Sequence, residues 1–164
     1  MTSGSVPVLW LCGPSGVGKS TTGFALFREL DDACYLDVDQ IRLCYPSTHA
    51  DEERLVARNL RAMWPNYLAA GLRRAVITGC VDSAAAAAAF VAALPGATVT
   101  MCRLRVGLAE LRARFVHRGA LLESLGDVDE ELAMLDATDF ADAVVDTGGL
   151  SIEQVVAAVR GVWR

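Results

Sequence analysis

One short segment of the sequence has the composition of a phosphate-binding loop. Residues 13–20 read Gly-Pro-Ser-Gly-Val-Gly-Lys-Ser, a complete match to the pattern G-x-x-x-x-G-K-[ST]. Glycines let such a loop curl so that its backbone N–H groups point at phosphate oxygens, and a following helix adds its positive dipole end. The segment therefore predicts a nucleotide site at Gly13, Ser15, Gly16, Val17, Gly18, Lys19, Ser20 and Thr21.

Lys19 is the only lysine in a chain that has 15 lysines and arginines. Its ammonium is a compact point charge, which the planar arginine fork does not replace in a tight loop. We expect Lys19 to be catalytic by reaching the β- and γ-phosphates of a nucleoside triphosphate. The Ser20 hydroxyl is then placed to bind Mg²⁺.

Two aspartates follow the next apolar run, in the segment Tyr35-Leu36-Asp37-Val38-Asp39-Gln40-Ile41-Arg42. Residues two apart in an extended chain point the same way, so Asp37 and Asp39 are expected to project together beside the phosphate loop. One carboxylate could hold a Mg²⁺-bound water while the other accepts the proton of an attacking hydroxyl. Arg42 could hold a polar or anionic part of the acceptor. The alternative is that both aspartates are solvated caps of the following helix.

A third carboxylate ends the apolar run Val76-Ile77-Thr78-Gly79-Cys80-Val81-Asp82. A carboxylate at this position often holds the water shell of the metal in nucleotide-binding proteins, so Asp82 is a candidate metal residue. With equal weight, Asp82 and Ser83 could simply cap the alanine-rich helix that follows.

Arg114 and Arg118 are four residues apart near the end of a helical segment, so they share one helix face. A guanidinium there could stack on a base or neutralise charge that develops on a transferred phosphoryl group. Arg118 is therefore a catalytic candidate and Arg114 a nucleotide-binding one. A solvated basic face at a helix C-terminus is the simpler alternative.

Apolar runs alternate with helical patterns along the whole chain, which is typical of an α/β domain with a parallel sheet. We expect one domain over residues 1–164. In the first helix, spanning about 19–30, Phe24, Phe27 and Leu30 are expected to be buried. Pro65 is expected to kink or interrupt the helix that begins near residue 51. The strands are expected at residues 7–12, 33–37, 74–80, 98–104 and 143–146.

Net charge and apolar content limit the kinds of partner that we expect for this chain. A net charge of −5 argues against a nucleic-acid partner, because phosphate neutralisation needs a basic face. The longest apolar stretch, residues 84–94, is far shorter than the roughly 20 residues of a membrane span. The N-terminus carries no positive charge ahead of its apolar run, so it does not read as a signal peptide. We expect a cytoplasmic protein, monomeric or homodimeric, with five structural cysteines.

The segments described above resemble those of the small P-loop kinases, a family that includes gluconate, shikimate and adenylylsulfate kinases and the antibiotic-resistance phosphotransferases for chloramphenicol and tunicamycin. Residues 36–42 are similar to the adenylylsulfate kinase pattern L-D-G-D-x-x-R, with Val38 in place of the glycine. Residues 145–151 resemble the stretch that lines the adenine pocket. The triple glycine of shikimate kinase is missing, and Thr78-Gly79-Cys80-Val81-Asp82 stands in its place.

The resemblance implies a three-layer α/β/α P-loop fold with a five-stranded parallel sheet of order 2-3-1-4-5 and a short lid at about 118–136. It implies ATP and Mg²⁺ as cofactors, Asp39 as acceptor-side base or anchor, Asp37 near the metal, and Thr147 and Gly148 at the nucleotide. The acceptor-binding residues expected are Asp37, Asp39, Arg42, Tyr45, Asn59, Met63 and Tyr67.

The sequence therefore predicts an ATP- and Mg²⁺-dependent phosphotransferase that acts on a hydroxyl of a small metabolite or antibiotic. Two alternatives stay open. The acceptor could be a nucleoside or nucleotide, or the chain could be an ATP-binding switch that has no small-molecule acceptor.

Overall fold

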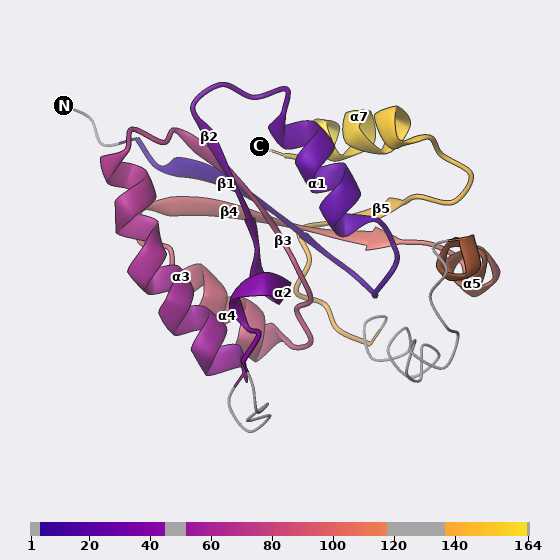
Figure 1. Cartoon of the computed structure of the whole chain (residues 1–164), viewed down its shortest axis with the longest axis horizontal. Coiled ribbons are helices and arrows are strands. Elements are labelled where there is room, and N and C mark those ends of the chain that lie inside the picture. Colours follow the sequence, from indigo (N-terminus) through magenta and orange to yellow (C-terminus); the bar gives the residue numbers. More distant parts are fainter. Residues whose placement is uncertain (1–3, 45–51, 118–136, 164) are drawn as a thin grey trace.

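The computed structural model describes residues 4–44, 52–117 and 137–163 (Figure 1). Strands and helices alternate along this part of the chain, as the sequence predicted. The strands are β1 (Val6–Cys12), β2 (Ala33–Asp37), β3 (Arg74–Thr78), β4 (Ala97–Arg105) and β5 (Ala143–Asp146). The helices are α1 (Lys19–Phe27), α2 (Val38–Ile41), α3 (Glu52–Ala69), α4 (Ala84–Ala92), α5 (Leu108–His117) and α7 (Ile152–Val162).

The five strands form one sheet in the order β2-β3-β1-β4-β5, which confirms the predicted order. Every neighbouring pair is parallel. Leu11 of β1 is in register with Thr78 of β3 on one side and with Cys102 of β4 on the other. All the strands therefore end at the same edge of the sheet, where loops that bind ligands gather in open α/β folds.

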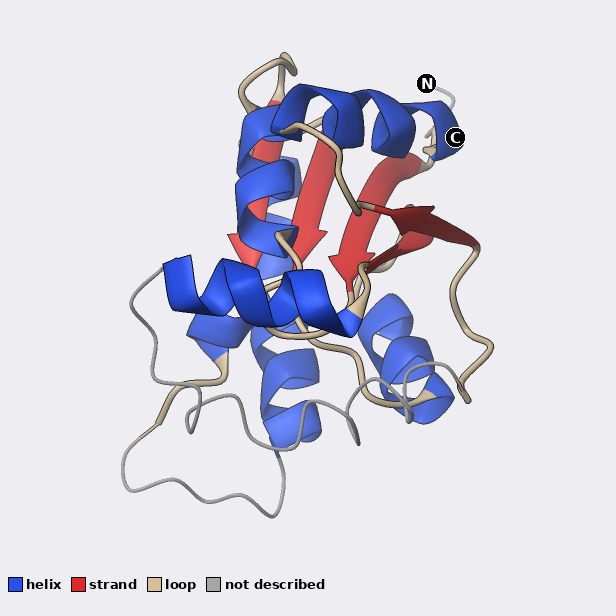
Figure 2. Ribbon diagram, turned by 90° about the vertical axis from the view of Figure 1, so that its right-hand side faces the viewer, coloured by secondary structure: helices blue, strands red, loops and turns tan. Residues whose placement is uncertain are grey.

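Helices cover both faces of the sheet, which confirms the three layers (Figures 1 and 2). On one face α3 and α4 pack against alternate residues of β1, and Trp10 stacks on Phe90 with ring centroids 5.2 Å apart. On the other face α1, α5 and α7 pack against Leu9 and Leu11. Because both faces of β1 are covered, residues Val8–Cys12 are fully buried.

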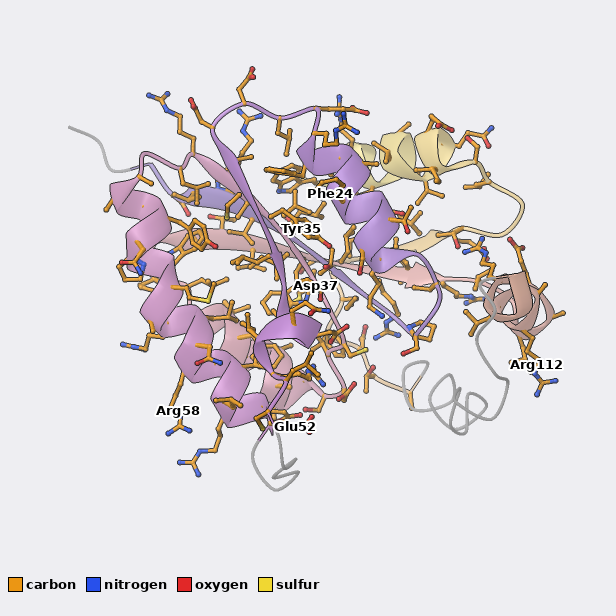
Figure 3. All side chains as sticks on the ribbon, viewed as in Figure 1. Phe24, Tyr35, Asp37, Glu52, Arg58 and Arg112 are labelled. Atoms are coloured by element: carbon orange, nitrogen blue, oxygen red, sulfur yellow. The ribbon has the colours of Figure 1, made fainter. Side chains whose placement is uncertain are left out.

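The buried stripe of α1 differs from the prediction. Phe24 is 50% exposed, and the helix instead buries Lys19, Thr22, Gly23 and Leu26. The cause is Gly23, because a Cβ at this position would lie 2.5 Å from Thr78 Cγ2. The backbone of α1 thus sits directly on the sheet at Gly23. Phe24 is turned outward, where it meets the edge of the Tyr35 ring at 5.6 Å (Figure 3).

Of the two effects expected at Pro65, a kink or an interruption, the interruption is wrong, because α3 continues through this residue. A proline inside a helix leaves the carbonyl four residues earlier without its usual donor. Here Pro65 and Arg61 both lie on the exposed side of α3, where water can bond the freed carbonyl. The opposite side holds the helix in place, since Trp64 is fully buried and donates from Nε1 to Pro95 O at 3.0 Å.

Two predicted helix caps are confirmed. Ser83 Oγ accepts from the Ala86 N–H at 3.0 Å and starts α4, and Ser151 with Gln154 forms a capping box at the start of α7. Among the described helices, none is both long and apolar enough to cross a membrane.

Candidate active site

The phosphate loop joins the end of β1 to the start of α1 along the carboxyl edge of the sheet. Gly13, Gly16 and Gly18 all have positive φ, with values of 133°, 79° and 110°. Gly13 is also fixed by space, because a Cβ there would lie 2.4 Å from Leu104 O of β4. The turn at Gly18 starts α1 without a side-chain cap, so no side chain occupies the first N–H groups of the helix as a cap.

Lys19 is buried at the base of this loop, with only 7% of its surface exposed. Its Nζ donates to Gly13 O at 2.9 Å, to Pro14 O at 3.0 Å and to Cys80 Sγ at 3.6 Å. A cavity of about 160 Å³ lies beside it. The lining residues are Ser15, Gly16, Gly18, Lys19, Ser20, Thr21 and Asp39.

Two of the predicted metal residues, Ser20 and Asp37, contact each other. Ser20 Oγ donates to Asp37 Oδ2 at 3.0 Å, so the start of α1 and the end of β2 are joined at this point. Asp82 is exposed just ahead of α4, where Ser83 and not Asp82 provides the cap. In the described ranges no three histidine, cysteine, aspartate or glutamate side chains form a metal cluster. Ser20 and Asp37 are hard oxygen donors of the kind that Mg²⁺ uses together with phosphate oxygens and water.

Asp37 and Asp39 reach the loop by a different route from the one predicted. They do not alternate along one extended strand, because the chain turns into α2 at Val38. Asp37 caps this short helix and its Oδ1 accepts from the Asp39 N–H at 3.0 Å. The cap alternative is therefore correct for Asp37, which binds Ser20 with its other oxygen.

α2 lies close against the end of β3. Val38 is fully buried there, and a Cβ on Gly79 would lie only 2.1 Å from Val38 Cγ2. Gly79 has a φ of 145°, and this turn ends β3 at Thr78, two residues before the predicted end. The close approach lets the next N–H, that of Cys80, donate to Asp39 Oδ1 at 3.3 Å.

Arg42 completes the cluster around Asp39. Its Nη2 donates to Cys80 O at 3.3 Å and lies 3.5 Å from Asp39 Oδ1, while its Nη1 lies 3.8 Å from Glu52 Oε2. Cys80 is thus the meeting point of Lys19 through its thiol and of Asp39 and Arg42 through its backbone. Glu52 was not predicted, and its place in the sequence, ten residues beyond Arg42 in a polar stretch, gave no signal of this contact.

The other residues predicted to bind the acceptor lie in different parts of the structure. Asn59 Nδ2 donates to Ile41 O at 2.7 Å and so holds the end of α2 against α3. Met63 and Tyr67 pack on the apolar cluster between the sheet and α3. Burial raises the pKa of Tyr67, with a smaller contribution from Cys34, which lies near the amino end of β2. The structure therefore does not bring Tyr67 to the carboxyl edge. Tyr45, Arg118 and the lid lie outside the described residues.

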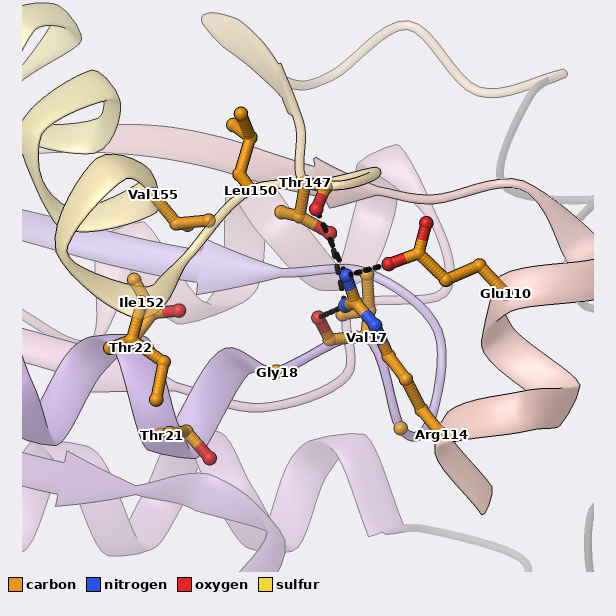
Figure 4. Close-up of a pocket in the computed structure, with 11 residues that line it drawn as sticks. Val17, Gly18, Thr21, Thr22, Glu110, Arg114, Thr147, Leu150, Ile152 and Val155 are labelled. Carbon is orange, nitrogen blue, oxygen red and sulfur yellow. Dashed lines mark hydrogen bonds and ion pairs between the residues drawn. The ribbon is translucent and has the colours of Figure 1, made fainter. Parts of the chain in front are cut away.

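A second cavity, of about 300 Å³, opens on the other side of the loop (Figure 4). Polar and apolar groups line it together. They are Gly16, Val17, Gly18, Thr21, Thr22, Glu110, Arg114, Thr147, Leu150, Ile152 and Val155. Three apolar members, Leu150, Ile152 and Val155, come from α7 and the loop before it, and Val17 comes from the phosphate loop.

Arg114 fixes the geometry of this cavity. Nη1 donates to Val17 O at 2.8 Å and to Thr147 Oγ1 at 3.1 Å, and Nη2 donates to Thr147 O at 2.9 Å and to Glu110 Oε1 at 2.7 Å. Gly149 N donates to Glu110 Oε2 at 3.1 Å. One guanidinium thus ties the phosphate loop, α5 and the β5–α7 loop together. Gly148, the last predicted nucleotide residue, bonds Asp146 Oδ1 at 2.9 Å in that same loop.

Several residues of this cavity were missed. Glu110 lies four residues before Arg114, a spacing that predicts an ion pair on one helix face, and this signal was available in the sequence. Thr22 and Val155 had no such signal. Their place at the cavity depends on how α1 and α7 pack over β1.

A parallel sheet of order 2-3-1-4-5, whose central strand leads into this glycine-rich loop, defines a P-loop nucleotide-binding domain. Residues 8–159 match the AAA domain family, and the chain belongs to that family. A comparison with curated protein sequences gave no match.

Solved structures with the same fold include a resistance protein and several kinases. The tunicamycin resistance protein of Deinococcus radiodurans is 21% identical, with a TM-score of 0.71 over 95% of this chain and 94% of that one. A sugar kinase from Janibacter is 16% identical, with a TM-score of 0.74 over 96% and 94%. Shikimate kinase from Bacteroides thetaiotaomicron is 18% identical, with a TM-score of 0.65 over 95% and 97%. The predicted resemblance in fold is thereby confirmed.

Proposed function

We propose that this protein transfers the γ-phosphate of ATP to a hydroxyl group of a small-molecule acceptor, with Mg²⁺ as cofactor. One observation carries the proposal: Asp39 lines the same small cavity as Lys19 and Ser20. A carboxylate able to accept a proton and a loop able to hold phosphates therefore face one space. The names of the solved relatives support the same reaction class.

The nucleotide is proposed to lie across both cavities. Its base occupies the larger one, against the apolar side chains of Leu150, Ile152 and Val155, with the Arg114 guanidinium on the wall. Its phosphates follow the loop to the start of α1, where unpaired backbone N–H groups and Lys19 stabilise negative charge. This placement brings the γ-phosphate to the end of the loop that faces Asp39.

The acceptor hydroxyl then attacks from the side of α2. Its oxygen forms a bond to the γ-phosphorus while the bond from that phosphorus to the β–γ bridging oxygen breaks, and ADP leaves. The hydroxyl proton passes to the Asp39 carboxylate, which the Cys80 N–H and Arg42 hold in orientation. Lys19 stays in the loop throughout, because two backbone carbonyls anchor its ammonium.

Ser20 and Asp37 fit the expected Mg²⁺. The Ser20 hydroxyl and an Asp37 oxygen are 3.0 Å apart, and both belong to the oxygen class that this ion prefers. When bound, the ion would neutralise charge on the phosphates. Asp37 would hold Ser20 and the water shell in orientation.

Labelled ATP provides the test. With γ-labelled ATP, Mg²⁺ and a panel of sugars, polyols, nucleosides and hydroxylated antibiotics, we expect label in an organic phosphate only when the right acceptor is present. Asp39→Asn should lower kcat by about 10²- to 10⁴-fold, the range for loss of a general base, with little change in ATP affinity. Release of label only as inorganic phosphate, at the same rate with every acceptor, would instead support the ATPase alternative.

A further inference from the structure

The ring of Tyr35 is held between the sheet and α1. A Cβ on Gly23 of α1 would lie 3.2 Å from Tyr35 Cε2 and 2.5 Å from Thr78 Cγ2, so the helix leaves only enough room for the flat ring. Phe24 and Phe27 lie beside the ring, with centroids 5.6 Å and 6.1 Å from its own. Because neighbours restrain the ring in this way, its hydroxyl has a fixed direction.

That hydroxyl meets the residues at the carboxyl edge of the sheet (Figure 3). Tyr35 Oη shares a hydrogen bond of 2.9 Å with the hydroxyl of Thr78, which is fully buried and in register with Asp37. Burial raises the pKa of Tyr35, the bond with Thr78 lowers it, and the charge of Asp37 raises it. Side-chain hydrogen bonds with Ser20 and with Asp37 contribute as well. The phenol is therefore a common neighbour of Thr78, Ser20 and Asp37.

One set of hydrogen-bond directions satisfies all of these groups. Ser20 Oγ donates to Asp37 Oδ2 at 3.0 Å, and the Asp39 N–H donates to Asp37 Oδ1 at 3.0 Å. An ionised carboxylate accepts more strongly than a neutral hydroxyl, so the Tyr35 hydrogen goes to Asp37 while Thr78 donates to the phenol oxygen. Asp37 is then held from three sides. The lone pairs of Ser20 Oγ stay available for Mg²⁺.

From this network we infer that Tyr35 is a positioning residue of the metal site: its hydroxyl holds Asp37, and through Asp37 the Ser20 hydroxyl, in the orientation that receives Mg²⁺ with the nucleotide. The inference rests on the proposed function and adds a residue to it. Tyr35 lines neither of the two cavities described above, so it acts through other side chains. Outer hydrogen bonds of this kind orient the ligands of a metal and tune its affinity.

Binding of a nucleotide with and without the metal tests this role without turnover. The probe is an ATP analogue in which nitrogen replaces the β–γ bridging oxygen. Calorimetry gives its affinity in Mg²⁺ and in excess EDTA, and the ratio of the two affinities is the Mg²⁺-dependent gain. Tyr35→Phe removes only the hydroxyl and should lower this gain about 10-fold or more. The affinity in EDTA should stay within about twofold, because the phosphate loop and the base cavity are unchanged.

Tyr67→Phe is the matched control. It removes the same oxygen from a half-buried tyrosine that packs between the sheet and α3, on the opposite face from α1, and it should leave the gain unchanged. Thr78→Val removes the partner hydroxyl of Tyr35 at nearly constant shape and should lower the gain about two- to tenfold. The double variant of Tyr35 and Thr78 should fall no further than Tyr35→Phe, because both changes break one network. Circular dichroism shows whether each variant is folded, and Thr78→Val provides the test if Tyr35→Phe is not.

The outcomes separate the inference from the proposed function. If the folded Tyr35 and Thr78 variants keep the full Mg²⁺-dependent gain, the inference is overturned while the proposed function stands. An equal loss of affinity in Mg²⁺ and in EDTA, or an equal loss of the gain in Tyr67→Phe, also overturns it, since the phenol would then serve packing alone. A parent protein that binds the analogue equally well with and without Mg²⁺ overturns the role of the metal in the proposed function, and the inference with it.

Discussion

Lys19 combines features that are rarely found together in one side chain. It is charged and buried, and its ammonium is shared between two backbone carbonyls and a thiol. A thiol is the weakest of these acceptors, so a phosphate oxygen can replace Cys80 Sγ while both carbonyl bonds stay in place. Lys19 therefore shapes the loop in addition to binding phosphate.

Lys19→Arg tests this dual role, because it keeps the charge and changes only the shape. The planar guanidinium cannot reproduce the bonds to Gly13 O and Pro14 O in the same space. We expect kcat/KM to fall about 10²- to 10³-fold, as for loss of one preorganised donor to the transition state. Steady-state kinetics give the value, and isothermal titration with ATP shows whether binding falls in parallel. Activity within about threefold of the parent protein would mean that charge alone is needed.

The Mg²⁺ concentration needed for activity distinguishes the three candidate metal residues, Ser20, Asp37 and Asp82. Ser20→Ala removes the hydroxyl of the 3.0 Å contact between the two side chains, and Asp37→Asn removes the negative charge of its acceptor. Each should raise the Mg²⁺ concentration for half-maximal activity about 10- to 100-fold. Asp82→Asn should change it by less than about twofold, because Asp82 is exposed ahead of α4. A large effect at Asp82 with none at Asp37 would reverse the assignment made here.

At the scale of elements, two close approaches set the positions of the functional groups. Gly23 lets α1 lie directly on β3, and Gly79 lets α2 lie against the end of that strand. The first fixes the helix that carries Lys19 and Ser20, and the second fixes the helix that carries Asp39. Side-chain-free backbone at these two points thus determines the distance between the phosphate loop and the base.

Two helical glycines, Gly23 and Gly161, provide a matched pair of substitutions. They test whether the close contact between α1 and the sheet requires a glycine. Gly23→Ala places a Cβ 2.5 Å from Thr78 Cγ2 and should destabilise the fold by about 1–3 kcal/mol, as overpacking does. Gly161→Ala in α7 has no atom within 4 Å of the new Cβ and should stabilise it by about 0.5–1 kcal/mol. Urea denaturation of both variants measures the two values. Equal effects of both substitutions would show that helix propensity, and not the contact with the sheet, determines the change in stability.

The sequence predicted elements better than it predicted orientations. Strand positions and the caps at Ser83 and Ser151 follow from local patterns, which is why they were correct. The sheet order, also correct, followed from the family resemblance. The exposure of Phe24 and the turn into α2 depend on contacts with Thr78 and Gly79, which are distant in the chain. The site shows the same division. The loop residues are contiguous, whereas Glu52 and Val155 reach their places only through packing.

At the scale of the whole molecule, the described cysteines lie mostly in the core. Burial raises the pKa of Cys12 and of Cys34 to about 11 and that of Cys102 to about 12, from the ordinary thiol value of 9.0. These thiols are therefore neutral at physiological pH and pack as small apolar groups, in agreement with the structural role expected of them.

The same pKa values predict a loss of stability at high pH. Below about pH 9 the three thiols are protonated in both the folded and the unfolded chain. Their burial then makes its full contribution to the free energy of unfolding. Between pH 9 and 12 the unfolded chain ionises first, and the free energy of unfolding falls. Cys102→Ala should make this decline shallower, as measured by urea denaturation across that range under reducing conditions. Cys44→Ala, at an exposed position, is the control and should leave the slope unchanged.

β1 lies in the middle of the sheet and separates the residues proposed to bind the base from those on the acceptor side. Groups proposed for the base come from α5, α7 and the loop after β5, all beyond β4, whereas Asp39, Arg42 and Glu52 come from the β2 and β3 side. Among the described residues, the phosphate loop and the start of α1 line the cavities of both halves. A new acceptor preference can therefore arise by changes in α2 and α3 while the nucleotide-binding half of the sheet stays intact.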